Sequence, residues 1–135
     1  MKITAIVERS KDGLYSIYSS DSIGRDCFGG YGDSVAEAKK DFLASIQEAI
    51  NNANKDGFDD VSVFEAVNVE FKYDIPSFFN YFDFFNVSKF ASYAGVNESR
   101  MRAYKSGVAF PGERTTKKIL KAVQSIVQEM SAASF

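Results

Sequence analysis

Four carboxylates that stand near one another in the first part of the chain could support hydrolysis. Asp21, Asp26, Asp33 and Glu37 could together hold Mg²⁺ for phosphodiester cleavage. Asp33 and Glu37, however, stand where a helix is expected to begin, and carboxylates are stabilised at that end of the helix dipole. We therefore expect these two residues to start a helix, and we predict no metal site and no cofactor.

Two other features of this region could carry chemistry. Gly29-Gly30-Tyr31-Gly32 precedes the same helix and could cradle a phosphate, but no lysine follows it as in a P-loop, so a turn is the favoured interpretation. Cys27 could be a reactive thiol, yet its acidic neighbours disfavour the thiolate. The chain has no histidine, which excludes Ser-His-Asp and Cys-His catalysis. We predict that the protein is not an enzyme.

The most informative spacing lies in VSKFASYAGVNESRMRAYKS, residues 87–106. Ala91 is small enough for two helices to approach, and Gly95 allows the positive φ of a tight turn. Asn97 stands where a second helix needs an N-cap. The apolar positions that would face a shared core are Phe90, Ala94, Val96, Met101 and Tyr104. These offsets are those of a helix-turn-helix.

The residues that follow agree with this interpretation. Gly107 and Pro111 come after the second helix, and an amphipathic helix is expected next. Its apolar side carries Ile119, Leu120, Val123, Ile126, Val127 and Met130. Residues 77–130 resemble the XRE or phage-repressor family of DNA-binding domains, although the run from Phe78 to Phe85 is unusually aromatic for that family's first helix. A small helical bundle without a DNA role is the alternative.

The resemblance implies that Asn97–Ser106 binds duplex DNA, with the second helix in the major groove. The side chains expected to face base edges are those of Glu98, Ser99, Arg102 and Ala103. The groups expected near phosphates are Arg100, Lys105 and the amides around Gly107, together with Lys89, Arg114 and Lys117. For the last three residues, an ordinary solvated position on the surface is the alternative.

The elements expected in the first half are strands. Residues 2–8 alternate between apolar and polar side chains, which is the period of a half-buried strand. Turn chemistry at Lys11-Asp12-Gly13, followed by Leu14–Ser19, predicts a hairpin. A short third strand is expected around Cys27-Phe28, and strict alternation over Val67–Tyr73 predicts another strand.

One helix is expected between these strands. Ser34 and Glu37 form a capping box, and Asp56-Gly57 is a natural stop. The apolar stripe that should lie on a sheet consists of Val35, Ala38, Phe42, Ile46, Ala49 and Ala53. Whether Val61–Phe64 is a paired strand or a loop stays open.

A boundary is expected at Ile75-Pro76, since proline ends the strand and Ser77 can cap a new helix. The aromatic run that follows contains Phe78, Phe79, Tyr81, Phe82, Phe84 and Phe85, which we interpret as a buried helix or dimer seam rather than a nucleotide-stacking platform. Residues 1–76 carry 14 acidic and 8 basic side chains, a net charge of −6, whereas residues 77–135 carry 4 and 8, a net charge of +4. This division is expected when only one half contacts a polyanion.

The first half resembles the N-terminal domain of HicB antitoxins. The match lies in Gly32–Ala38, which is similar to the family's G-D-[ST]-x-x-E-A helix start, and in Cys27 shortly after Gly24. Ser20–Gly24 departs from the family's Pro-Asp-Leu-Pro-Gly-like loop, because it contains no proline. The resemblance implies a partial RNase H-like domain, so the expected class is α+β: a small antiparallel sheet with one packed helix, then an all-α helix-turn-helix domain.

These resemblances imply a HicB-like antitoxin and transcriptional autorepressor. Residues 1–76 would neutralise a small basic HicA-type mRNA interferase, and residues 77–135 would bind operator DNA as a homodimer or higher even oligomer. The alternative is an orphan repressor whose first half dimerises or senses a ligand; a hydrolase is the least favoured class. With a single cysteine and no apolar run of about 18 residues, a cytoplasmic protein without membrane contact is expected.

Overall fold

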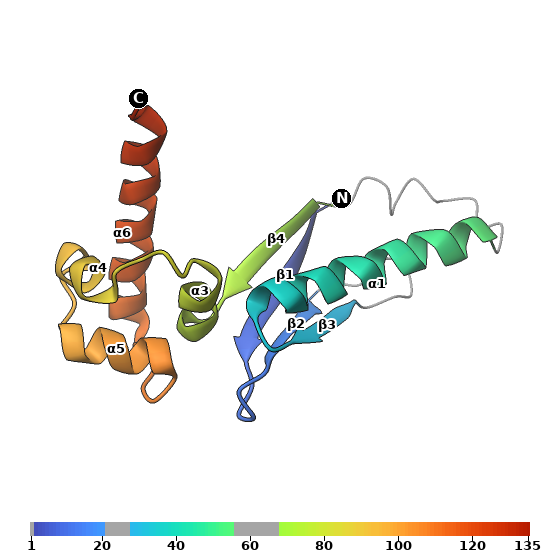
Figure 1. Cartoon of the computed structure of the whole chain (residues 1–135), viewed down its shortest axis with the longest axis horizontal. Helices are drawn as coiled ribbons and strands as arrows, with labels where there is room; N and C mark the ends of the chain where they lie inside the picture. The colour runs from blue at the N-terminus through green and yellow to red at the C-terminus, as the bar shows by residue number, and fades with distance from the viewer. Residues whose placement is uncertain (1, 21–27, 56–67) are drawn as a thin grey trace. The chain divides into compact units, whose positions relative to one another are not determined.

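The computed structural model describes residues 2–20, 28–55 and 68–135 of the chain. The chain divides into two compact units, Met1–Tyr81 and Phe82–Phe135, whose elements are labelled in Figure 1. This division lies a short way beyond the boundary predicted after Pro76, because the helix that contains Pro76 packs within the first unit. Along the described ranges, no helix is both long and apolar enough to cross a membrane.

The first unit is built on a four-stranded sheet with the order β3-β2-β1-β4. The strands are β1 (Lys2–Arg9), β2 (Tyr15–Ser19), β3 (Gly29–Gly32) and β4 (Asn68–Tyr73). The predicted hairpin is confirmed, since β1 and β2 pair antiparallel around a turn with Gly13 at φ 86°. The third strand begins just after the predicted position, and Val61–Phe64 lies outside the described residues.

The sheet is mixed, so the prediction of an antiparallel sheet is wrong. β4 pairs parallel with β1, and Val69 lies opposite Ile3 in the register. The long helix α1 (Val35–Lys55) separates β3 from β4 in the chain. Parallel strands need a connection of about a dozen residues or more, usually helical, and α1 supplies one. The resulting arrangement is an α+β unit in which one strand pairs parallel with its neighbour.

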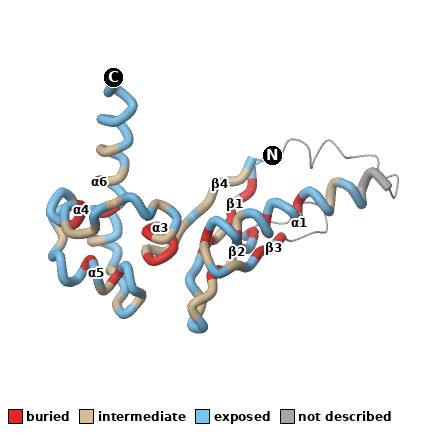
Figure 2. The backbone as a smooth tube through the Cα atoms, in the orientation of Figure 1, coloured by how far each residue is buried: buried red, intermediate tan, exposed pale blue. Residues whose placement is uncertain are grey.

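Helix α1 lies on one face of the sheet, where the core of the unit forms (Figures 1 and 2). The predicted capping box is present: the Glu37 amide donates to Ser34 Oγ at 3.2 Å, and the Glu37 carboxylate accepts from the Asp33 amide at 3.0 Å. The buried core residues of the unit are Ile3, Ala5, Val7, Tyr15, Ile17, Phe28, Val35, Ala38, Phe42 and Ile46. This burial confirms the alternation along β1 and the helical stripe at Val35, Ala38, Phe42 and Ile46. Ala49 is half-buried, and the side chain of Ala53 lies outside the described residues.

The glycines before α1 allow a strand and a helix to approach closely. A Cβ atom at Gly30 would lie 2.5 Å from the carbonyl oxygen of Ala38 and from the amide nitrogen of Phe42. At Gly32 it would lie 2.6 Å from Cβ of Glu37. The interpretation of Gly29–Gly32 as a turn is therefore wrong: the segment is a strand, and the absent side chains leave room for the α1 backbone.

Helix α3 (Ile75–Tyr81) also differs from the prediction. Its N-cap is Asp74, whose carboxylate accepts from the Ser77 amide at 2.8 Å and from the Arg9 amide at 2.8 Å. Ser77 lies inside the helix and is fully buried. The helix ends at Tyr81, so the aromatic run does not form one buried helix, and Phe84 in the second unit is 72% exposed.

The side chain of Lys39 on α1 contacts aromatic residues of both β4 and α3. Its ammonium lies 3.5 Å from the ring centre of Tyr81 and 4.3 Å from that of Phe71, and it donates to the Tyr73 hydroxyl. Burial lowers the pKa of Lys39, and burial also raises the pKa of Tyr73 to about 12. These contacts join α1, β4 and α3 through one cation and three rings.

The second unit consists of three helices: α4 (Val87–Ala94), α5 (Glu98–Ser106) and α6 (Glu113–Ala132). Its buried side chains come from all three helices and are Phe90, Ala91, Met101, Tyr104, Ile119 and Ala122. The predicted core positions Phe90, Met101 and Tyr104 are confirmed, whereas Ala94 and Val96 are half-buried. Met101 is fully buried, so the α5 backbone is fixed against its neighbours.

Candidate nucleic-acid interface

The turn between α4 and α5 has the geometry that the sequence predicts. Gly95 adopts φ 72°, and its amide donates to the Ser92 carbonyl at 3.2 Å. The Val96 amide donates to the Ala91 carbonyl at 2.9 Å, so the turn satisfies two carbonyls in the last turn of α4. Asn97 then caps α5, since its side chain accepts from the Arg100 amide at 3.1 Å. The predicted positive φ at Gly95 and the predicted N-cap at Asn97 are both confirmed.

This turn presents one face of α5 to solvent. Met101 and Tyr104 are buried and Ala103 is half-buried, whereas the other residues of α5 are exposed. The exposed polar side chains of the helix are those of Glu98, Ser99, Arg100, Arg102, Lys105 and Ser106. A short helix held by its buried face and lined with hydrogen-bonding groups on the other can present those groups to a groove.

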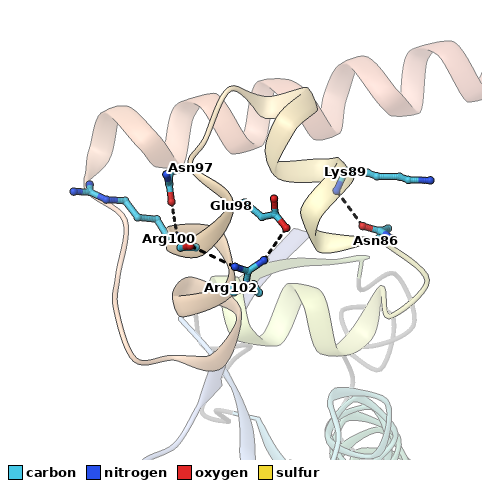
Figure 3. Close-up of polar contacts among 7 residues, drawn as sticks. Asn86, Lys89, Asn97, Glu98, Arg100 and Arg102 are labelled. Atoms are coloured by element: carbon cyan, nitrogen blue, oxygen red, sulfur yellow. Dashed lines mark hydrogen bonds and ion pairs between the residues drawn. The ribbon is translucent and has the colours of Figure 1, made fainter.

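Two of the predicted base contacts are paired with each other. Arg102 Nη1 lies 2.7 Å from Glu98 Oε1, and both side chains are about half exposed (Figure 3). Arg102 Nη2 also donates to Ser99 Oγ at 3.4 Å. The structure therefore brings three predicted base contacts into one cluster, in which Glu98 neutralises and orients the guanidinium.

The hydroxyl of Ser88 completes this cluster from the preceding helix. A hydrogen bond from Ser88 is the main cause of the lowered pKa of Glu98, and the hydrogen bond from Arg102 is the second cause. The role of Ser88 was not predicted from the sequence. In the sequence, Ser88 is recognisable only as a hydroxyl residue in the first turn of α4. Such residues are common at helix starts, so its type and position do not predict a contact with another helix.

The predicted phosphate contacts surround this cluster without belonging to it. Lys89 and Arg100 point away from the Glu98–Arg102 pair in Figure 3, and both are exposed. Lys105 and Arg114 are also exposed, and within the described part of the chain neither forms an ion pair. Four cations are therefore accessible to a polyanion around α5.

Three other predicted contacts have less support. The Gly107 amide donates to the Tyr104 carbonyl at 3.2 Å, and the Val108 amide donates to the Ala103 carbonyl at 3.0 Å. These amides close the C-terminus of α5, so a phosphate contact through them is not supported. Ala103 is half-buried and offers only a methyl group. Lys117 pairs with Glu113 at 3.2 Å on an exposed turn of α6.

A hollow of about 210 Å³ lies beside the N-terminus of α5. Its lining consists of Gly95, Val96, Asn97, Arg100, Tyr104, Thr115 and Lys118. Lys118 and Thr115 were not predicted as site residues, although each lies within one helical turn of a predicted cation. Arg100 and Lys118 give the hollow two positive charges, which suits a phosphate better than a base.

The candidate chemistry of the first unit receives no support. Asp33 and Glu37 have the helix-start contacts predicted for them, and Asp21, Asp26 and Cys27 lie outside the described residues. In the described ranges, no group of three or more potential metal-ligating side chains comes together. The strongest arrangement of functional side chains described in the chain is therefore the one around α5.

Comparisons with models of protein families, with curated proteins and with solved structures found no match to this chain.

Proposed function

We propose that this protein binds duplex DNA sequence-specifically, with α5 in the major groove and α4 lying across the backbone. The observation that carries the proposal is the capped turn at Gly95–Asn97, which holds α5 with its polar face outward. That face carries a guanidinium held by Glu98 and Ser99, and an arginine fork matches the major-groove edge of guanine. The XRE-like spacing of residues 87–106 supports the same proposal.

The charge of the second unit favours a polyanionic partner. Residues 82–135 carry 8 basic and 4 acidic side chains, a net charge of +4. Two of those acids, Glu98 and Glu113, are paired with cations of their own helices. The accessible cations therefore outnumber the accessible anions around α5, which favours binding to phosphates and makes it salt-dependent.

The first unit is proposed to bind a protein partner. Residues 1–81 carry 14 acidic and 8 basic side chains, a net charge of −6, and this favours a basic protein. By resemblance to HicB antitoxins, the partner is a small HicA-type mRNA interferase, which the first unit neutralises while the second unit represses the operon. Co-purification of the full chain from its native cells, followed by identification of a stoichiometric small basic protein, tests this part. Recovery of the chain alone would favour the orphan repressor.

The test of DNA binding uses a pool of random-sequence duplexes and the duplex upstream of the protein's own gene. Enrichment of a motif by the full chain, and protection of that motif in footprinting, are expected. Lys105→Ala should lower the slope of log affinity against log salt by about one, because it removes one phosphate contact. Lys40→Ala removes the same charge from an exposed position on α1 and is the matched control, expected to leave the slope unchanged. Absence of salt-sensitive binding to any duplex would contradict the proposal.

A further inference from the structure

The hollow beside the N-terminus of α5 is lined by groups that donate hydrogen bonds. We call it the α5–α6 hollow, and its polar lining residues are Asn97, Arg100, Tyr104, Thr115 and Lys118. No acidic side chain stands in the lining that the described residues form, and Arg100 and Lys118 have only donors. The side-chain oxygen of Asn97 already accepts from the Arg100 amide, so its NH₂ group is left to donate. The hollow is therefore suited to an anion.

Tyr104 brings an unused hydroxyl to this hollow. The residue is only 6% exposed, yet within the described ranges its hydroxyl forms no hydrogen bond. The hydroxyl of a buried tyrosine normally has a partner, because removing it from water without one costs free energy. Since Tyr104 lines the α5–α6 hollow, a ligand bound there would supply the missing partner.

The start of α6 adds a main-chain donor. Gly112 is the N-cap of this helix and offers no side chain to cap it. Thr115 lies in the first turn of α6 and lines the hollow, and no hydrogen-bond acceptor for its amide is found along the described parts of the chain. Free amides at the start of a helix attract anions, and the helix dipole adds to this attraction.

The charge and size of the hollow indicate which anion it fits. Two cations match the charge of a phosphate monoester, about −1.5 to −2 at pH 7, better than the single charge of a carboxylate or a phosphodiester. The terminal oxygens of a monoester also accept more hydrogen bonds than a carboxylate does. The volume of about 210 Å³ is below the roughly 300–1,000 Å³ of pockets for drug-sized ligands, so a phosphoryl group on a small molecule suits it.

The direction of the hollow favours a free ligand over the DNA backbone. Arg100 and Tyr104 are one helical turn apart and lie on one side of α5. Arg100 is two residues from both Glu98 and Arg102, a spacing that places it about 160° around the helix from that pair. Figure 3 shows its side chain pointing away from them. A group in the hollow would therefore be held on the side of α5 away from the proposed base contacts.

We propose that the α5–α6 hollow binds the phosphate monoester group of a small molecule. Arg100, Lys118 and the Tyr104 hydroxyl are its side-chain contacts, and the Thr115 amide is its main-chain donor. This binding goes beyond the proposed function and does not depend on it.

Titration of the full chain with methyl phosphate, without DNA and at constant ionic strength, tests the site. Nuclear magnetic resonance should show saturable shifts of the backbone amides of Gly95, Asn97 and Thr115, with a dissociation constant in the millimolar range or below. Dimethyl phosphate, which has one charge, should bind at least about fivefold more weakly.

Three variants identify the contacts. Tyr104→Phe keeps the buried ring and should weaken methyl phosphate binding by about 10-fold, because a hydrogen bond to a charged group is lost. Lys118→Ala should weaken it by about fivefold. Lys121→Ala removes the same charge from an exposed position on α6 outside the lining, and it should bind like the wild type. Circular dichroism checks that each variant is folded.

Three results would overturn the proposal. The titration could produce no saturable shifts in the hollow. Lys118→Ala and Lys121→Ala could weaken binding equally, which would show a diffuse attraction to positive charge. Dimethyl phosphate could bind as tightly as methyl phosphate, or these amides could shift only with duplex present, which would assign the hollow to the DNA backbone. Because the titration contains no DNA, its failure and the failure of duplex binding are separate results.

Discussion

At the scale of single residues, the pair formed by Glu98 and Arg102 would govern how α5 contacts a base in the proposed complex with DNA. A free arginine would approach guanine from many rotamers, whereas Arg102 is already held by Glu98 at 2.7 Å and by Ser99 at 3.4 Å. Holding the guanidinium reduces the side-chain entropy lost on binding. In the proposed complex, the same pair would bring a carboxylate near the phosphates, so Glu98 would both orient the arginine and reduce the overall attraction to DNA.

Replacing Arg102, alone and together with Glu98, tests these two proposed effects of the Glu98 carboxylate. Arg102→Ala should weaken binding to the selected duplex by about 1–3 kcal/mol and relax the preference at particular base pairs. Part of that loss should come from the unpaired carboxylate of Glu98, so the Glu98→Gln/Arg102→Ala double variant should recover some affinity without recovering specificity. Fluorescence anisotropy with the selected and a scrambled duplex measures both effects. Equal losses on the two duplexes would mean that Arg102 contacts only phosphates.

The lowered pKa of Glu98 predicts how acid affects the second unit. The hydrogen bond from Ser88 and then that from Arg102 favour the ionised carboxylate, so the folded-state pKa lies below its ordinary value of 4.5. The stabilisation is therefore present above the ordinary value and is lost as the pH falls through the lowered folded value. Thermal unfolding of Glu98→Gln should give a lower Tm than the wild type at pH 7, and the difference should shrink as the pH falls toward 3.

The matched control for this titration is Glu129→Gln. Glu129 is exposed on α6 and forms no ion pair with any residue in the described ranges. The difference in Tm between Glu129→Gln and the wild type should be small and should stay constant as the pH is lowered from 7 to 3. A Glu98→Gln difference that stays constant from pH 7 to pH 3 would show that the carboxylate charge is not the stabilising feature.

At the scale of elements, glycine is required for different reasons at different positions: close packing at Gly30, backbone conformation at Gly95, and neither at Gly112. A Cβ atom at Gly30 would lie 2.5 Å from two α1 backbone atoms, which cannot move without displacing the helix from the sheet. At Gly95 a Cβ atom meets nothing within 4 Å, but the backbone has φ 72°. At Gly112 there is also open space, and φ is −73°. The three positions thus differ in the physical cost of adding one methyl group.

Alanine substitution at each of these positions should therefore have a different effect. Gly95→Ala should destabilise the second unit by about 1–2 kcal/mol, the cost of a left-handed conformation for a residue with a Cβ atom. Gly30→Ala should destabilise the first unit by more than this, because the added Cβ atom would clash with backbone atoms of α1 and push the helix away from the sheet. Gly112→Ala is the control and should cost less than either, because the added Cβ atom meets open space and only the weaker N-cap preference of alanine is involved. Chemical denaturation of the purified variants measures all three, and equal effects would contradict the distinction.

At the scale of the whole molecule, the division into units depends on α3. Ser77 is fully buried and Phe79 is 2% exposed within the first unit. Asn80 accepts a hydrogen bond from the Val35 amide at 2.9 Å, so α3 also supports the start of α1. A boundary drawn at the proline would remove these contacts from the unit that they stabilise.

Two fragments test this boundary. Residues 1–81 should fold with a cooperative thermal transition, whereas residues 1–76 should be much less stable. Loss of the Phe79 ring alone should cost about 3–5 kcal/mol, as for other well-packed aromatic side chains. Circular dichroism during heating measures both fragments under the same conditions. Equal stability of the two would mean that α3 contributes little to the first unit.

Much of the local structure could be predicted from the sequence, because local interactions determine it. The Ser34–Glu37 capping box, the stripe along α1, the alternation along β4 and the Gly95–Asn97 turn each involve residues close together in the chain. Their spacing alone specifies which hydrogen bonds and which faces they form. The polar residues of α5 were identified as a candidate interface for the same reason.

Only the tertiary structure determined the features that depend on distant residues. The parallel pairing of β4 with β1 follows from the path of the chain through α1, and the place of α3 follows from its packing on the first unit. The Ser88–Glu98–Arg102 cluster depends on the approach of two helices, which the sequence spacing permits without specifying its contacts. The exposure of Leu120, Val127 and Met130 on α6 could not be predicted, because apolar periodicity indicates that a face will be buried but not what will cover it.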